Sequence, residues 1–93
     1  MIRVKIVFTE TGTGEEESFI TNLPELTGEA VIKAVTDYTN DPNTDDPHKI
    51  DFHLKLRSWV QVKRLAAVVA TCHDNYFGDM IWMIQVYQDF IER

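Results

Sequence analysis

The chain opens with apolar residues that alternate with Arg3, Lys5 and Thr9. Apolar side chains stand at every second position, at Ile2, Val4, Ile6 and Phe8. This period of two places them on one face of a β-strand. The Thr-Gly-Thr-Gly segment at 11–14 tolerates the positive φ of a tight turn, and β-favouring residues follow at 18–21. Residues 2–22 are therefore predicted to form a β-hairpin.

A helical period replaces the alternation after Pro24. Apolar residues recur at i, i+3, i+4 and i+7, at Val31, Ala34, Val35 and Tyr38. Thr27 precedes them and has the side chain of a helix N-cap. This spacing predicts a helix of about three turns over residues 27–38. Residues 40–47 contain two prolines among Asn and Asp, which favours an exposed loop.

The second half of the chain contains one clear strand pattern and two longer apolar segments. Alternation returns at Ile50, Phe52, Leu54 and Leu56, which predicts a third strand. Ser58 to Gln61 has capping-box spacing, and a helical period then continues from Trp59 to Cys72, which favours a long helix. Residues 80–84 are all apolar and fit a helix or a buried strand; the length and polar end of the segment favour a helix.

Together these segments predict one α+β domain spanning residues 1–93. A small sheet of about three strands, formed by the N-terminal hairpin and one later strand, would be covered by two or three helices. The predicted order is ββαβα followed by a helix or a strand. A chain of 93 residues has no room for a separate catalytic domain beside a binding domain.

Composition and charge restrict the possible surroundings of this domain. Cys72 is the sole cysteine, so no internal disulfide can form. The N-terminus lacks the apolar core of a signal peptide, and no apolar run approaches the ~20 residues that cross a bilayer. We therefore expect a cytoplasmic protein without a membrane partner. The net charge of −6, concentrated in residues 1–47, argues against general nucleic-acid binding.

Residue clusters with possible chemistry are each incomplete. The loop Asp41-x-Asn43-x-Asp45 begins like a calcium loop, but Asp46 and Phe52 stand where Gly and Glu are required. His48, Asp51 and His53 lack a further strong ligand at zinc-site spacing. Cys72, His73 and Asp74 are consecutive and cannot align as a catalytic line on a helix. The sequence therefore predicts no cofactor, metal or catalytic residue.

Aromatic side chains near the end of the chain suggest an interaction function instead. Trp and Tyr are favoured at the centres of protein interfaces. The leading hypothesis is a non-enzymatic interaction module: a homodimer, or a small subunit or inhibitor of another protein. Its predicted anchors are Trp59, Trp82, Tyr87 and Phe90. A second contact surface for a basic partner would be acidic and comprise Glu15, Glu16, Glu17, Asp41, Asp45 and Asp46.

Two alternatives from other classes remain open at this level. A nucleic-acid-binding protein would use a basic face formed by Lys55, Arg57, Lys63 and Arg64, beside His53. A small thiol-dependent or metal-dependent enzyme would use Cys72, His73 or His53.

Overall fold

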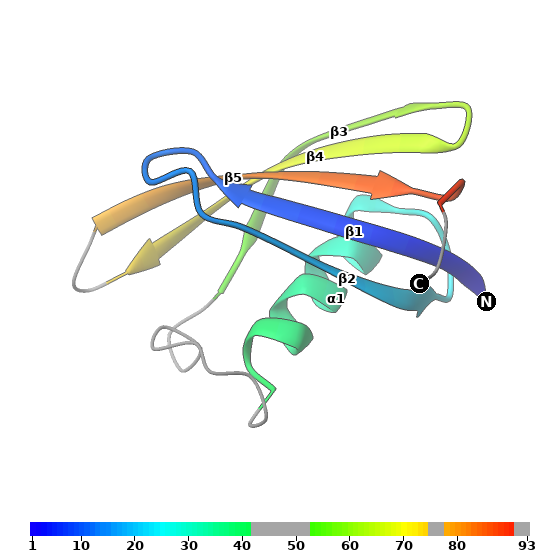
Figure 1. Ribbon diagram of the computed structural model, residues 1–93. Coiled ribbons are helices and arrows are strands. Elements are labelled where there is room, and N and C mark those ends of the chain that lie inside the picture. Colours follow the sequence, from blue (N-terminus) through cyan, green and yellow to red (C-terminus); the bar gives the residue numbers. More distant parts are fainter. Residues whose placement is uncertain (42–52, 75–77, 91–93) are drawn as a thin grey trace.

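A computed structural model describes residues 1–41, 53–74 and 78–90 of the chain. In chain order its elements are β1 (Ile2–Glu10), β2 (Glu16–Leu23), α1 (Gly28–Thr39), β3 (Lys55–Val62), β4 (Leu65–Asp74) and β5 (Gly78–Tyr87). The five strands form one antiparallel sheet in the order β2-β1-β5-β4-β3. The single helix α1 lies across one face of this sheet (Figure 1).

The predicted N-terminal hairpin is confirmed. β1 and β2 pair in an unbroken antiparallel register from Ile2 opposite Leu23 to Thr9 opposite Glu16. The turn between the strands uses Gly14 with a φ of 76°, a conformation that glycine adopts without steric cost. The alternating residues of β1 behave as predicted, because Val4, Ile6 and Phe8 are buried beneath the helix.

The predicted helix at 27–38 is also confirmed, as α1. Thr27 is its N-cap, with extended backbone and a side-chain Oγ1 that accepts a hydrogen bond from the Ala30 N–H at 3.2 Å. Val31 and Val35 are fully buried against the sheet. The N-terminal turn of the helix lies close to β3. A Cβ placed on Gly28 would be only 2.8 Å from a Leu56 methyl carbon, so this position has no room for a larger residue.

The long helix predicted after Ser58 is wrong. The segment instead forms β3 and β4, which are joined by a turn at Lys63 and Arg64. Lys63 has a φ of 54°, the left-handed conformation of a tight hairpin turn. The helical period was misleading because both faces of these strands carry apolar side chains, so the alternation that marks a strand disappears.

The helix favoured for the last segment is wrong as well. Residues 78–87 form β5, which pairs with β1 on one side and with β4 on the other. β5 is therefore the central strand of the sheet, and Trp82, Ile84 and Val86 enter the core. Its neighbours Ile81 and Met83 point to the opposite face and leave about half of each side chain exposed.

These two corrections change the fold class. The prediction of three strands covered by two or three helices is replaced by five strands and one helix in the described residues. A single helix covers one face of the sheet only, so the other face has no cover within those parts of the chain. The predicted third strand survives only in part, because Leu56 lies in β3 whereas Ile50 and Phe52 lie outside the described residues.

No helix in the described ranges is long and apolar enough to cross a membrane. Several residues singled out from the sequence fall outside those ranges: Asn43, Asp45, Asp46, His48 and Asp51.

Candidate functional site

The helix-free face of the sheet carries a cluster of exposed apolar side chains. Alternate residues of each strand point to it, and rows of paired residues cross it from β3 toward β2. One row is Val62, Leu65, Tyr87, Lys5 and Ile20; the next is Val60, Ala67, Gln85, Val7 and Ser18; a third is Ser58, Val69, Met83, Thr9 and Glu16. Large apolar side chains stand in every row.

These apolar side chains are exposed as well as adjacent. Apart from Met1, every exposed large apolar residue of the described chain lies on this face, with 38–62% of its surface accessible: Ile20, Val60, Val62, Leu65, Ile81 and Met83. On β3, β4 and β5 the three rows contain no charged residue among those described. We call the part formed by Val60, Val62, Leu65, Ala67, Val69 and Met83, together with Ile81 of the next row, the open face; in that next row Thr71 of β4 and Lys55 of β3 follow Ile81.

Of the predicted aromatic anchors, Tyr87 lies on the helix-free side, whereas Trp59 and Trp82 lie on the helix side. Tyr87 is half-buried, and its hydroxyl donates a hydrogen bond to Gln85 Oε1 at 2.9 Å. Trp82 is buried on the helix side, where its indole N–H donates to Cys72 Sγ at 3.2 Å. Trp59 packs against the same core, and Phe90 follows β5 and is half-buried.

The aromatic residues predicted as anchors and the exposed aliphatic residues are therefore different sets, and the prediction did not include the aliphatic ones. Ile81 and Met83 alternate with the buried residues of β5, whereas Val60 and Val62 of β3 stand on either side of the exposed Gln61. The signal that could have revealed them is the run of consecutive apolar residues, which places apolar side chains on both faces if the segment is a strand.

The predicted acidic surface divides between the two faces of β2. Glu15, Glu16 and Glu17 are all exposed at the start of this strand. Glu16 pairs with Thr9 on the helix-free side, whereas Glu17 pairs with Phe8 on the helix side. Asp41 follows α1 and, together with Glu17, acts electrostatically on Tyr38.

The predicted basic face does not form one patch. Lys55 and Arg57 lie at the start of β3, whereas Lys63 and Arg64 form the turn at its far end, about 20 Å away at the rise of a strand. The Arg57 Nε–H donates to Thr71 Oγ1 at 3.1 Å, and Arg64 forms an ion pair with Asp89 at 2.9 Å. The structure therefore separates the cations that a nucleic-acid backbone would need together.

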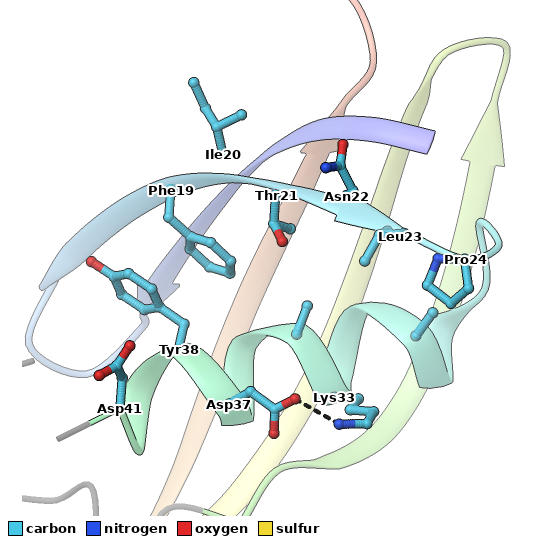
Figure 2. A pocket seen from close by; sticks show the side chains of 12 residues that line it. Phe19, Ile20, Thr21, Asn22, Leu23, Pro24, Lys33, Asp37, Tyr38 and Asp41 are labelled. Carbon is cyan, nitrogen blue, oxygen red and sulfur yellow. Dashed lines mark hydrogen bonds and ion pairs between the residues drawn. The ribbon is translucent and has the colours of Figure 1, made fainter. Parts of the chain in front are cut away.

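A groove runs between the edge strand β2 and helix α1, on the helix side of the sheet (Figure 2). Its volume is about 510 Å³. Phe19 from β2 and Tyr38 from α1 stack at one end with ring centroids 4.2 Å apart and an interplanar angle of 4°. Lys33 and Asp37 form a 2.6 Å ion pair on the helix wall, while Ile20 points away from the groove.

The pKa of the Tyr38 hydroxyl indicates that this end of the groove is negatively charged. Burial raises the pKa of its hydroxyl above the ordinary tyrosine value, and the negative charges of Glu17 and Asp41 raise the pKa further. A cation placed near this hydroxyl would therefore be attracted.

No protein-family model matches this chain, and no curated protein or solved structure is significantly similar to it. Function is therefore inferred from the surfaces of the molecule.

The thiol and metal alternatives find little support in the described geometry. Cys72 is buried, whereas its neighbour His73 is exposed on the opposite face of β4, where Nδ1 lies 2.8 Å from Asp79. Successive strand residues point to opposite faces, so the thiol and this imidazole cannot act together. Within residues 1–41, 53–74 and 78–90, no three His, Cys, Asp or Glu side chains are grouped to hold a metal ion.

We expect the Cys72 thiol to react slowly with a thiol reagent in the native protein. Burial and the contact with the Trp82 indole shield the sulfur, so modification requires local or global opening. Labelling by an aromatic disulfide should be at least ~100-fold slower in buffer than in denaturant, given typical opening free energies. Rapid stoichiometric labelling of the native protein would instead support an accessible, reactive thiol.

Proposed function

We propose that this protein is a non-enzymatic interaction module whose open face binds a second copy of the same chain. The observation that carries the proposal is the clustering of exposed Ile, Val, Leu and Met side chains on the helix-free face. Contiguous exposed apolar surface of this kind marks interaction sites on stable proteins. We further propose a cytoplasmic location, where the lone cysteine of the chain stays reduced.

The extent of the helix-free face is sufficient for a dimer. Five strands spaced by about 4.8 Å, each about eight residues long at about 3.3 Å per residue, give a footprint of roughly 600 Å². Two such footprints amount to about 1,200 Å², which is the lower limit for specific, stable interfaces. Protruding side chains such as Met83 increase the area that is actually removed from water.

One mode of self-association brings opposite charges together at the β1–β2 side of the helix-free face. Two sheets packed face to face align their strands to within about 30°. Consider a two-fold axis that lies between the two sheets, perpendicular to the strands, at the row that contains Val7 and Val60. It places each strand antiparallel to its own copy in the second sheet. On β1, Lys5 lies two residues before this row and Thr9, which pairs with Glu16 of β2, lies two residues after it. The axis therefore brings Lys5 toward Glu16 of the partner subunit, so opposite charges meet beside an apolar centre.

A pair of adjacent substitutions on β3 tests the proposal. Val60 and Gln61 are both exposed, but Val60 points to the open face and Gln61 to the helix side. Val60→Asp would place a charge in the apolar interface and should weaken dimerisation at least ~10-fold, equivalent to about 1.4 kcal/mol. Gln61→Asp introduces the same charge one residue away and should leave the dimer intact. Light scattering after size exclusion, over a concentration series, measures both.

Two outcomes would count against self-association. A wild-type protein that remains monomeric at the highest soluble concentration would reject the second copy as the partner. Equal dissociation constants for wild type and Val60→Asp would show that the copies associate through another surface.

A further inference from the structure

We infer that the groove between β2 and α1 is a second binding site, which accepts an extended basic segment of another protein as an added strand next to β2. This site is separate from the open face, because it lies on the helix side of the sheet and at the opposite edge from β3. The inference therefore goes beyond the proposed self-association and stands on different residues.

The first supporting feature is the outer edge of β2. Among the described residues, this strand is at the end of the sheet order and pairs with β1 alone. Its eight residues run in register with β1 without a break from Glu16 to Leu23. Alternate N–H and C=O groups of such an edge point outward, in the spacing that an extended peptide needs for main-chain hydrogen bonds.

The second feature is the helix that runs beside this edge. Figure 2 shows α1 on the side of the groove opposite β2, while Phe19, Thr21 and Leu23 project from β2 toward the helix. On the helix, the small side chains of Ala30 and Ala34 leave space between the two elements. Every second side chain of an added strand would enter this space, and the residues between would point to the helix-free side of the sheet.

The third feature, charge, selects the chemistry of the peptide. Asp37 and Asp41 line the groove, and Glu17 acts on Tyr38 at the same end. Lys33 is the single cation among the lining residues and forms an ion pair with Asp37. This excess of negative charge attracts lysine and arginine and repels an acidic strand, while the stacked rings of Phe19 and Tyr38 offer a flat apolar surface to the stem of such a side chain.

The test uses a short fluorescein-labelled peptide in which lysine and valine alternate, with binding followed by fluorescence anisotropy. We expect a dissociation constant in the range of about 10–100 µM, which is ordinary for a short extended peptide. Replacing the lysines by glutamate should weaken binding at least ~10-fold, because the groove is acidic. N-methylation of alternate amides should have a similar effect, because it removes the main-chain donors required for strand addition.

Two substitutions on α1 provide a matched pair for the same measurement. Ala34→Lys fills the groove and adds a positive charge, and should weaken binding of the lysine–valine peptide at least ~10-fold. Thr36→Lys adds the same charge to the same helix away from the groove lining and should change binding less than ~2-fold. Lysine is a good helix former, so both variants should keep helix α1, and circular dichroism verifies their fold.

Three results would overturn the inference: absence of binding by the lysine–valine peptide, equal binding of its N-methylated form, or equal binding to the Ala34→Lys variant. Repeating the titration with Val60→Asp separates the two sites. Peptide binding should persist in that variant whether or not the open face forms a dimer.

Discussion

Trp82→Ala is expected to lower the free energy of unfolding by about 3–5 kcal/mol, the usual cost of removing a large aromatic side chain from a core. Trp82 is only 7% exposed and lies in the central strand β5. Its ring centroid is 5.7 Å from that of Phe8, and its indole N–H donates to Cys72 Sγ. Truncation therefore leaves a cavity between the sheet and helix α1. Urea denaturation followed by circular dichroism measures the loss.

The neighbouring substitution Met83→Ala provides the control. Met83 is 47% exposed on the opposite face of β5, so its truncation should change the stability of the monomer by less than about 1 kcal/mol. The comparison is made at low protein concentration, where dissociation does not contribute. If Trp82→Ala instead retained wild-type stability and separated the dimer, Trp82 would be an interface anchor and the proposed open face would be wrong.

Glu10→Gln is expected to destabilise the native state by about 1.5 kcal/mol at neutral pH, a typical value for a charged hydrogen-bond acceptor. The Glu10 side chain is 5% exposed at the end of β1. Its carboxylate accepts hydrogen bonds from the backbone N–H of Gly12, at 2.9 Å, and from that of Thr13. It therefore holds the turn of the N-terminal hairpin, and a neutral amide accepts these bonds more weakly. Glu25→Gln changes an exposed carboxylate and serves as the control.

The effect of Glu10→Gln should depend on pH in a defined direction. The hydrogen bond from Gly12, followed by those from Thr13, lowers the pKa of Glu10 below its ordinary value, against a smaller opposing effect of burial. Since the pKa is lower in the folded state, the stabilisation is fully present above the ordinary glutamate pKa and is lost as pH falls through the folded pKa. Denaturation curves from pH 7 to about pH 3 should show the two proteins converging in acid. A difference in the free energy of unfolding that stays constant over this pH range would show that the ionised form of Glu10 is not what stabilises the turn.

The hairpin and the helix could be predicted because each has one apolar face and a defined end. In β1 the buried residues Val4, Ile6 and Phe8 alternate with residues outside the core, so only one period fits. In α1, Thr27 marks the start and Val31 and Val35 define the buried side. Local pattern and final burial agree in both segments, and the sequence was sufficient.

The second half could not be assigned in this way because its strands are apolar on both faces. In β4, Val68 is fully buried while Val69 is half-buried on the helix-free side, and in β5 Trp82 and Met83 divide in the same way. Such a pattern has no period of two, so a helical period fitted by coincidence. β-branched residues such as Val60 and Val62, with the turn at Lys63, were the available signals for strands.

The same property limited prediction of the candidate site. Without the strand assignment, the aromatic Trp82 and the aliphatic Met83 could not be placed on opposite faces, and the larger residue was selected as the anchor. A sheet that is covered by a helix on one side and by another chain on the other requires apolar residues on both faces. The feature that obscured the fold is therefore the one on which the proposed self-association rests.

The most direct test of self-association through the open face is to record methyl nuclear magnetic resonance spectra at a series of protein concentrations. We predict that the methyl signals of the open face, including those of Val60, Ile81 and Met83, move together as the protein is diluted, while those of Val31 and Val35 in the core stay fixed. Open-face signals that stay unchanged across the whole concentration range, in a protein that remains folded, would contradict self-association through this face.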